Sequence, residues 1–224
     1  QADFADLLRM VDEVEGIRRV RFMTSHPKDI SDKLIDTIKN GQHICEHIHL
    51  PVQYGSNRIL KAMNRVYTVE KYRERAQRVR EALPEASLTT DLIVGFPGET
   101  EEDFAAGLDF VRQMGFARMH VFPYSARRGT PAARRTDQVP PMVRKERAAR
   151  MQALAEELAE AYHRSVLGSA AEVLFETCEE GVTDGLTETY IRVYTDAPVT
   201  RGEIVPMRLM HLYRDGIWGE PISK

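Results

Sequence analysis

The alternation of strand-like and helix-like segments constrains the fold of this chain more than any other feature. Strand-like apolar runs cover residues 18–24, 47–52, 88–94 and 119–124. An amphipathic stretch with helical spacing precedes the first run, and one or two such stretches follow each run. Strands that alternate with crossover helices pair in parallel, so the pattern predicts an α/β barrel or an open α/β sheet. The last of these helices is long, from about residue 142 to residue 165.

The pattern changes after Gly168. Short strand-like runs follow at residues 173–175, 190–194, 204–209 and 212–213, separated by turn signals such as Asp184-Gly185 and Asp215-Gly216. Helical spacing does not recur in this tail. We therefore predict two domains, an α/β part over residues 1–166 and a small β-barrel over residues 167–224.

The chain has 224 residues but only two cysteines, Cys45 and Cys178. Two cysteines do not make a disulfide framework, so a reducing cytoplasm is the expected location. No run of 18 apolar residues occurs and no secretory leader opens the sequence, so we expect neither a membrane segment nor export. The first residue is Gln1 rather than Met, which suggests a piece of a longer protein.

Charge is strongly segregated along the chain, although the formal net charge is only −3. Residues 58–80 and residues 127–150 each carry eight Lys or Arg against two Asp or Glu, whereas residues 166–224 carry five against ten. The basic blocks are either solvated helix faces or a surface for a polyanion, because clustered positive charge is what phosphates select.

Polar clusters follow the predicted strands at their carboxyl ends, where parallel α/β folds place their sites. The clusters are Thr24-Ser25-His26, Pro51-Val52-Gln53, Gly95-Phe96-Pro97-Gly98-Glu99 and Tyr124-Ser125. The glycine-rich cluster is either a plain turn or a close backbone approach to a ligand, and it lacks the Gly-Lys-Ser/Thr ending of a phosphate loop. Asp91 lies inside an apolar strand, so its carboxylate needs either a salt bridge or a ligand hydroxyl.

A run of His and Cys at alternate positions stands before and within the second predicted strand, at His43, Cys45, His47 and His49. Alternate strand residues share a face, but zinc sites gather their ligands from two separated pairs, and this run has no second pair. We therefore predict no metal site here and interpret His49 as a hydrogen-bonded interior histidine.

Several ordered motifs resemble the radical-SAM methylthiotransferases. They are His49-Leu50-Pro51-Val52-Gln53, Ser56, Arg58-Ile59-Leu60, Met63-Asn64-Arg65-Val66-Tyr67-Thr68, the run from Thr89 to Thr100, Tyr124-Ser125 and Gly129-Thr130-Pro131-Ala132-Ala133. The tail resembles the RNA-binding TRAM β-barrel of that family, most visibly at Tyr190-Ile191-Arg192-Val193. The resemblance covers essentially the whole chain, and it implies the C-terminal part of a (β/α)6 radical-SAM barrel followed by a TRAM-like domain.

The resemblance implies S-adenosylmethionine and [4Fe-4S] clusters as cofactors of the parent protein. The family holds its clusters on cysteines of a Cys-x-x-x-Cys-x-x-Cys loop and of a domain before the barrel. Neither set occurs in this chain, so we expect the chain alone to be inactive. By order and motif, Gln53, Arg65 and Asp91 match residues that contact S-adenosylmethionine in related enzymes, with Gly95 near the adenine. Tyr54 stands where the family usually has Ser.

The implied reaction adds a methylthio group to a modified adenosine beside the anticodon of tRNA. Residues 24–29 look more like the enzymes for N6-isopentenyladenosine. Residues 120–125 and the tail look more like those for N6-threonylcarbamoyladenosine, which is our main expectation. The alternatives are the isopentenyladenosine enzyme, a ribosomal-protein methylthiotransferase, a non-catalytic RNA-binding module, and a metal-independent enzyme with Asp91 or His49 as base. Expected contacts to the anticodon loop are Arg127, Arg128, Arg134, Arg135, Tyr190 and Arg192, with added charge from Arg144, Lys145 and Arg147.

Overall fold

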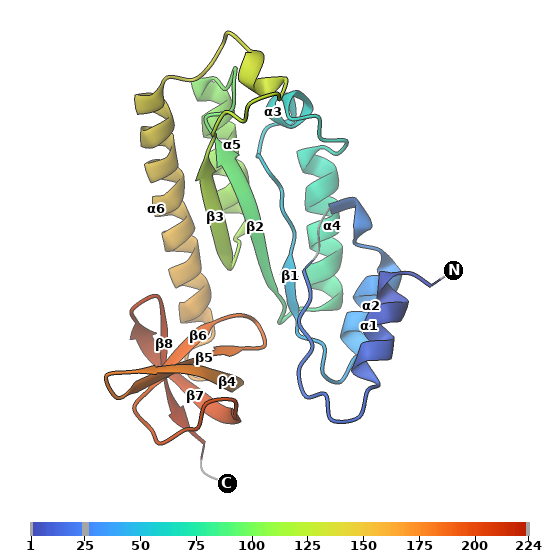
Figure 1. The fold of residues 1–224 in the computed structure, drawn as a ribbon, viewed down its shortest axis with the longest axis vertical. Helices are drawn as coiled ribbons and strands as arrows, with labels where there is room; N and C mark the ends of the chain where they lie inside the picture. The colour runs from blue at the N-terminus through green and yellow to red at the C-terminus, as the bar shows by residue number, and fades with distance from the viewer. Residues whose placement is uncertain (1, 24–26, 223–224) are drawn as a thin grey trace.

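An α/β part and a small β-barrel make up the chain, joined by one long helix (Figure 1). The structure, a computed structural model, describes residues 2–23 and 27–222, so the polar cluster Thr24-Ser25-His26 lies outside the described residues. The helices are α1 (Phe4–Asp12), α2 (Asp32–Asn40), α3 (Asn57–Ala62), α4 (Val69–Ala82), α5 (Glu101–Met114) and α6 (Pro141–Ser165), with 3-10 turns at Pro27–Asp29 and Ala132–Arg134. The strands are β1 (His47–His49), β2 (Ser87–Val94), β3 (Arg118–Pro123), β4 (Ala170–Glu179), β5 (Val182–Thr187), β6 (Arg192–Thr195), β7 (Ile204–Tyr213) and β8 (Gly216–Pro221).

Side-chain caps fix where the predicted helices begin. Ser31 and Thr68 each accept a hydrogen bond from the first turn of α2 and α4, which satisfies a backbone N–H that has no partner within the helix. Thr100 and Asp103 form a reciprocal capping box at the start of α5, as the sequence predicts. Gly115 ends α5 in the left-handed conformation at φ 55°, which glycine adopts at little cost.

The α/β part contains a parallel sheet in the order β1-β2-β3. The strand predicted over residues 18–24 is wrong, because its described residues make only one isolated bridge, between Val20 and Ile44. The Val20 amide donates to the His43 carbonyl at 2.7 Å, and the Cys45 amide donates to the Val20 carbonyl at 2.9 Å. On either side of Val20, the side chains of Arg19 and Arg21 donate to carbonyl groups of the β-barrel.

Helices cover one face of the sheet. Tyr72 of α4 packs edge-on against Phe110 of α5 and against Phe116, and its hydroxyl donates to the Leu50 carbonyl at 2.6 Å. Among the described residues no helix lies over the opposite face, which is turned toward the viewer in Figure 1 and is here called the open face. No described helix combines the length and the apolar character needed to cross a lipid bilayer.

The five strands of the tail form a closed barrel in the order β4-β5-β6-β8-β7, which confirms the predicted small β-barrel. The predicted turn at Asp184-Gly185 is wrong, because both residues lie inside β5. A Cβ at Gly185 would lie 2.2 Å from the Leu174 carbonyl oxygen, so this glycine allows β4 and β5 to approach closely. The sequence also missed β8, which pairs with β6 and β7.

The β-barrel is held against the α/β part near the amino ends of the strands of the parallel sheet. Arg19 donates to the carbonyls of Leu186 at 2.9 Å and of Glu172 at 3.1 Å, and Arg21 donates to the Thr187 carbonyl at 2.6 Å. Helix α6 ends at Ser165 and β4 begins at Ala170, next to the predicted boundary. The division into domains of residues 1–166 and 167–224 stays a prediction.

Candidate functional site

A cavity of about 500 Å³ lies at the carboxyl ends of the parallel strands. Two of the four predicted cofactor residues, Gln53 and Asp91, line it together. The other lining residues come from the ends of β2 and β3 and from the segment after β3: Ile93, Phe96, Phe122, Pro123, Tyr124, Ser125, Arg127, Thr130 and Ala132. The structure therefore brings the clusters after residues 52, 94 and 123 to one place, as a parallel sheet should.

Backbone pairing with β2 fixes the position of Gln53. Its amide donates to the Asp91 carbonyl at 3.0 Å, and its carbonyl accepts from the Ile93 amide at 3.0 Å. Gln53 adopts φ 68°, a strained value for a non-glycine residue and one that often marks a functional site. Tyr54 is fully buried and packs beside Gly107 of α5, so its bulk is accommodated among the helices and it is not one of the cavity-lining residues.

Asp91 faces the cavity from the middle of β2 and is half-buried. Its Oδ2 lies 3.4 Å from Nε2 of His49, a contact that is an ion pair only when His49 is protonated. His49 in turn contacts the Thr89 hydroxyl through Nδ1 at 3.0 Å, which confirms the interior, hydrogen-bonded histidine. Thr89 was missed at the sequence level, although its spacing of two from Asp91 places both on the open face.

Arg65 and Gly95 do not line this cavity. Arg65 lies between α3 and α4, and its Nε is buried without a hydrogen-bond partner among the described residues. Gly95 adopts φ 74°, and the Arg144 side chain fills the space where its Cβ would be, at 2.3 Å. The roles of Arg65 and Gly95 toward a cofactor stay predictions.

The cavity carries an unsatisfied polar group that suits a polar ligand. The hydroxyl of Tyr124, one of the lining residues, is buried without a hydrogen-bond partner among the described residues. Because buried polar groups are normally satisfied, such a group indicates a site that a ligand or water completes. Tyr124, Gln53 and Asp91 together fit the hydroxyl-rich adenosyl part of S-adenosylmethionine.

The cysteines do not fit an iron–sulfur cluster. Such clusters are held by several thiolates at one place. Cys45 is buried just before β1, whereas Cys178 is exposed on β4 of the barrel. No group of three or more His, Cys, Asp or Glu side chains with metal-binding geometry occurs among the described residues.

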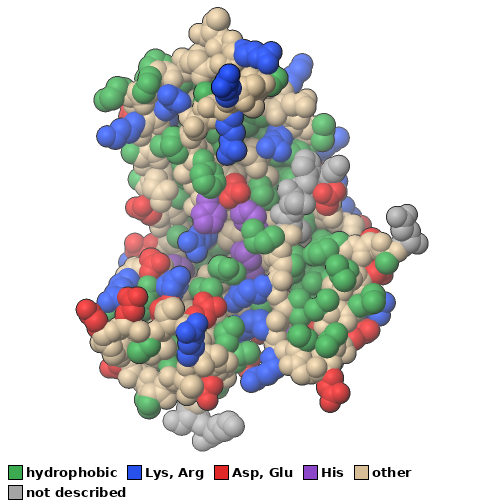
Figure 2. Space-filling model, viewed as in Figure 1, with side chains coloured by type: hydrophobic (Ala, Val, Ile, Leu, Met, Phe, Trp, Pro, Cys, Tyr) green, Lys and Arg blue, Asp and Glu red, His purple; other side chains and the backbone are tan. Residues whose placement is uncertain are grey.

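Four of the five arginines predicted to bind RNA lie on the segment between β3 and α6. Arg127 and Arg128 are exposed and have no ion pair in the described part of the chain, and Arg127 lines the cavity. Arg134 is also exposed, whereas Arg135 pairs with Asp137 at 2.5 Å. Figure 2 shows Lys and Arg side chains gathered at the end of this face that is farthest from the β-barrel.

Tyr190 and Arg192 already have partners within the chain. The Tyr190 ring stacks on His47 with centroids 4.6 Å apart, and the Arg21 guanidinium lies 4.5 Å from its centroid. Arg192 pairs with Asp184, with Asp215 at 3.7 Å. Both residues border a second cavity of about 440 Å³ between β3, α6 and the barrel, which meets the first cavity at Phe122.

The expectation that Arg147 adds positive charge for RNA is wrong. Arg147 is buried and pairs at 2.8 Å with Glu99, whose side chain is fully buried. Arg144 is directed inward as well and donates to the Tyr124 carbonyl at 2.7 Å. Lys145 is exposed.

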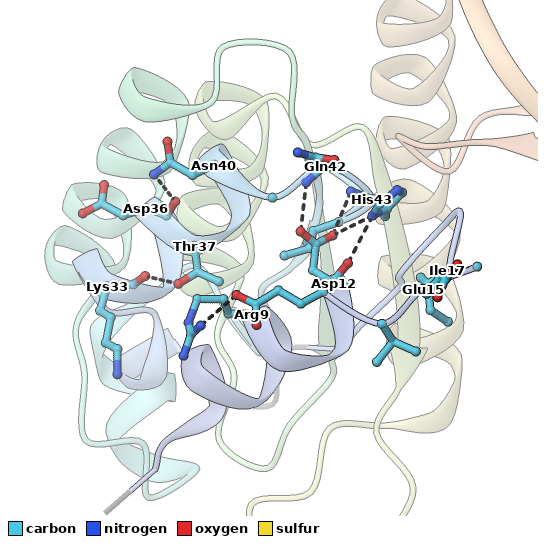
Figure 3. A pocket seen from close by; sticks show the side chains of 15 residues that line it. Arg9, Asp12, Glu15, Ile17, Lys33, Asp36, Thr37, Asn40, Gln42 and His43 are labelled. Atoms are coloured by element: carbon cyan, nitrogen blue, oxygen red, sulfur yellow. Dashed lines mark hydrogen bonds and ion pairs between the residues drawn. The ribbon is translucent and has the colours of Figure 1, made fainter.

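A third cavity, about 850 Å³, lies elsewhere, between α1, α2 and the segment before β1 (Figure 3). Three of its charged groups are paired: Arg9 with Glu13 at 2.8 Å, and Asp12 with the amides of Gln42 at 3.0 Å and His43 at 2.8 Å. It lies at the amino end of β1, away from the residues that the sequence predicts for the site.

Residues 1–111 match the Radical SAM superfamily. This part of the chain belongs to the radical-SAM superfamily. Two solved structures share its fold: coproporphyrinogen III oxidase from Escherichia coli, described as a radical SAM enzyme, and Elp3 from the archaeon Methanocaldococcus infernus. The first has a TM-score of 0.53 and 16% identity over 92% of this chain and 52% of its own. The second has a TM-score of 0.50 and 15% identity over 100% of this chain and 63% of its own.

Curated relatives of this radical-SAM chain carry the name tRNA-2-methylthio-N(6)-dimethylallyladenosine synthase. The protein from Desulfitobacterium hafniense is 50% identical over 185 residues, which are 83% of this chain and 41% of the relative. The protein from Syntrophotalea carbinolica is 44% identical over 227 residues, covering 99% of this chain and 52% of the relative. The chain therefore spans about half the length of these relatives.

Proposed function

We propose that this chain is part of a tRNA methylthiotransferase that acts on N6-isopentenyladenosine. N6-dimethylallyladenosine is another name for the same nucleoside. The observation that carries the proposal is the identity of up to 50% with relatives named for that substrate. They favour the isopentenyladenosine alternative over the threonylcarbamoyladenosine expectation, which rested on the segment 120–125 and the tail.

The cavity at the carboxyl ends of the strands is the proposed site for S-adenosylmethionine. The Asp91 carboxylate can accept hydrogen bonds from ribose hydroxyls, and the Gln53 side-chain amide can both accept hydrogen bonds from them and donate to them. Arg65 can pair with the carboxylate of the methionine part, because its buried Nε has no partner among the described residues. When bound with its cluster in the parent protein, S-adenosylmethionine supplies the radical chemistry of the superfamily.

The anticodon loop of tRNA is the proposed partner of the segment after β3. Arg127 and Arg128 are exposed beside the cavity, so phosphates next to the modified adenosine can reach them. In the barrel, Arg192 already pairs with Asp184 and Asp215, and the Tyr190 ring, which is 37% exposed, already contacts His47 and Arg21. We therefore assign most of the attraction for RNA to the segment after β3, and the cytoplasm, where tRNA is modified, stays the proposed location.

The function is tested by mass spectrometry of tRNA nucleosides from cells without the gene for this chain. We expect N6-isopentenyladenosine to accumulate without its 2-methylthio group, and the full gene on a plasmid to restore that group. Loss of the methylthio group from N6-threonylcarbamoyladenosine instead would support the first expectation. Unchanged levels of both nucleosides, with a changed ribosomal protein mass, would support the ribosomal-protein methylthiotransferase.

A second candidate, a non-catalytic RNA-binding module, applies to the chain by itself and rests on its two separated cysteines. We expect the purified chain to show no iron–sulfur absorption after anaerobic reconstitution and no reductive cleavage of S-adenosylmethionine. Iron analysis and the visible absorption spectrum measure this. A stoichiometric cluster signal would show that Cys45 and Cys178 do more than their positions indicate.

A further inference from the structure

Three side chains of β3 form a row on the open face and have no role in the proposed function. Arg118, His120 and Phe122 occupy alternate positions of the strand, opposite residues 89–93 of β2, so they point to the same side of the sheet. All three are exposed, and Phe122 is 50% exposed although its side chain is large and apolar. Figure 2 shows histidine side chains at the centre of this face, between the basic end and the β-barrel.

Phe122 is the lining residue that two cavities share. It borders the cavity of about 500 Å³ that contains Gln53 and Asp91, and also the cavity of about 440 Å³ that contains Arg118 and His120. Both volumes lie in the range of about 300–1,000 Å³ that is usual for ligand pockets. In the described part of the chain the Phe122 ring has one ring contact, with His120 at 6.4 Å and a tilt of 32°. The cavities therefore meet at a ring that is largely open to a ligand.

The position of Phe122 suits the base of an RNA substrate. An enzyme that modifies a base takes it out of the base stack, and unstacked bases are held on aromatic side chains. Reacting atoms must come within about 3–3.5 Å of each other. The proposed function puts S-adenosylmethionine in the cavity of Gln53 and Asp91, so the reacting base must lie where the second cavity adjoins it. That place is Phe122.

Cations stand on both sides of this ring. Arg118 borders the second cavity and Arg127 borders the first. Arg118 is exposed and has no ion pair among the described residues, so its guanidinium is available to a phosphate. Tyr190 and Arg192, on the barrel side of the second cavity, already make contacts within the chain. The row on β3 thus combines an open ring with an unpaired cation, the two groups that hold single-stranded RNA.

We propose that the adenine to be modified stacks on Phe122 at the junction of the two cavities, and that Arg118 binds a phosphate of the same RNA strand. This inference rests on the proposed function and adds to it the residues that hold the substrate base. His120 lengthens the wall on which the base lies, because its ring is the neighbour of Phe122 on the same face.

Stacking is tested by binding of this chain to two anticodon stem-loops, one with N6-isopentenyladenosine beside the anticodon and one with an abasic site there. Fluorescence anisotropy at fixed salt gives the ratio of the two dissociation constants. The cost of unstacking the base in the free RNA is the same for every protein variant, so it cancels when ratios are compared. We expect Phe122→Leu to shift the ratio about tenfold against the isopentenyladenosine RNA, because the base loses its ring.

Two variants control this measurement. Phe122→Tyr keeps a ring and should keep the ratio of the unmodified protein. Phe4→Leu makes the same replacement at a ring of α1 that is 44% exposed, and it should also leave the ratio unchanged. Equal affinity of Phe122→Leu and the unmodified protein for the abasic RNA shows that the variant is folded. An unchanged ratio in Phe122→Leu, with binding intact, would refute the stacking and leave the proposed function standing. Absence of binding of either RNA by the unmodified protein would instead overturn the RNA partner, and the stacking with it.

The phosphate contact of Arg118 is tested by the salt dependence of binding to the isopentenyladenosine RNA. Arg118→Gln should lower the slope of log K against log salt by about 0.7–0.9, which corresponds to one phosphate. Arg112→Gln, on α5 at the other face of the sheet, is the matched control and should not change the slope. An unchanged slope in Arg118→Gln would disprove the phosphate contact, while the ratio measured with Phe122→Leu would still decide the stacking.

Discussion

At the scale of single residues, the buried pair of Arg147 and Glu99 separates a structural arginine from the basic surface around it. Arg147 also donates to the Glu99 carbonyl at 3.1 Å and lies 3.1 Å from Glu101. Burial raises the pKa of Glu99, while the Gly95 amide, Tyr54 and Arg147 favour its ionised form. Charge counting along the sequence cannot find this pair, because its partners are 48 positions apart.

Arg147→Ala is expected to lower the free energy of unfolding by about 3–5 kcal/mol, because it leaves Glu99 buried without its counter-charge. Urea unfolding at pH 7 followed by circular dichroism measures the change. Arg150→Ala is the matched control: its side chain is 44% exposed and its pair with Glu101 lies at the surface, so we expect a loss of less than about 1 kcal/mol. Equal losses in both variants would contradict the structural role of Arg147.

His47 is expected to make the protein less stable in mild acid. Its folded pKa of about 4 lies below the unfolded value of 6.5, so the unfolded state binds the proton first. The stability is present above about pH 6.5 and is lost as the pH falls toward 4, by roughly 2–3 kcal/mol between pH 7.5 and pH 4.5. His47→Gln should flatten this part of the pH profile in urea unfolding, whereas the exposed His211→Gln should not. A profile unchanged by His47→Gln would show that other groups carry the acid sensitivity.

At the scale of elements, the loop after β1 touches α5 where two glycines meet. A Cβ at Gly55 would lie 2.9 Å from the Cα of Gly107 and 2.9 Å from the Cβ of Phe110, which leaves no room for a methyl group. A Cβ at Gly107 would have its nearest neighbours in the Tyr54 ring at 3.7 Å, an ordinary contact distance. The same approach of loop and helix therefore tolerates a side chain on one partner only.

Gly55→Ala is expected to destabilise the protein by about 1–3 kcal/mol, because it overpacks a buried contact with backbone. Gly107→Ala should be neutral or stabilising by up to about 1 kcal/mol, because alanine is the better residue inside a helix. Thermal unfolding of the two variants measures both effects. Destabilisation by Gly107→Ala as well would show that the loop lies closer to α5 than described.

Helices were easier to predict than strands, for physical reasons that the elements show. The starts of α2, α4 and α5 follow from local caps at Ser31, Thr68 and Thr100. Whether residues 18–23 form a strand depends on backbone pairing with a segment elsewhere in the chain, and Val20 alone makes such a bridge, to Ile44. Gly185 looked like a turn residue because a close crossing of strands and a turn both require glycine.

The residues of the site divide in the same way, into those that a sequence rule predicts and those that depend on distant packing. Gln53 and Asp91 meet because parallel strands end at one edge, a rule that needs only the strand order. The unpaired Tyr124 hydroxyl and the contacts of Thr89 depend on side-chain packing that spacing does not encode. The contacts of Tyr190 with His47 and Arg21 likewise depend on how the barrel is folded against the sheet, and its predicted role toward RNA stays a prediction.

At the scale of the whole molecule, replacing Arg127, Arg128 and Arg134 with Gln is expected to weaken binding of an anticodon stem-loop and to reduce its salt dependence. The slope of log K against log salt should fall by about 0.7–0.9 for each phosphate that the variant no longer binds, because each bound phosphate releases a counterion. Filter binding between low and moderate salt measures the slope. Arg192→Gln in the barrel is the control and should change it little, since Asp184 already pairs with that side chain. A slope that falls in Arg192→Gln and stays unchanged in the triple variant would indicate that the RNA binds the barrel instead.

Helix α6 has a consequence for how this molecule tolerates change in length. It runs uninterrupted over 25 residues from the segment after β3 to the barrel. An α-helix rises about 1.5 Å and turns about 100° with each residue, so one inserted residue would both displace the barrel and swing it around the helix axis. The carbonyls of Leu186 and Thr187 would then no longer face Arg19 and Arg21. The residue count of α6 thus sets the rotational phase of the barrel, and insertions that approach whole helical turns should be the least disruptive.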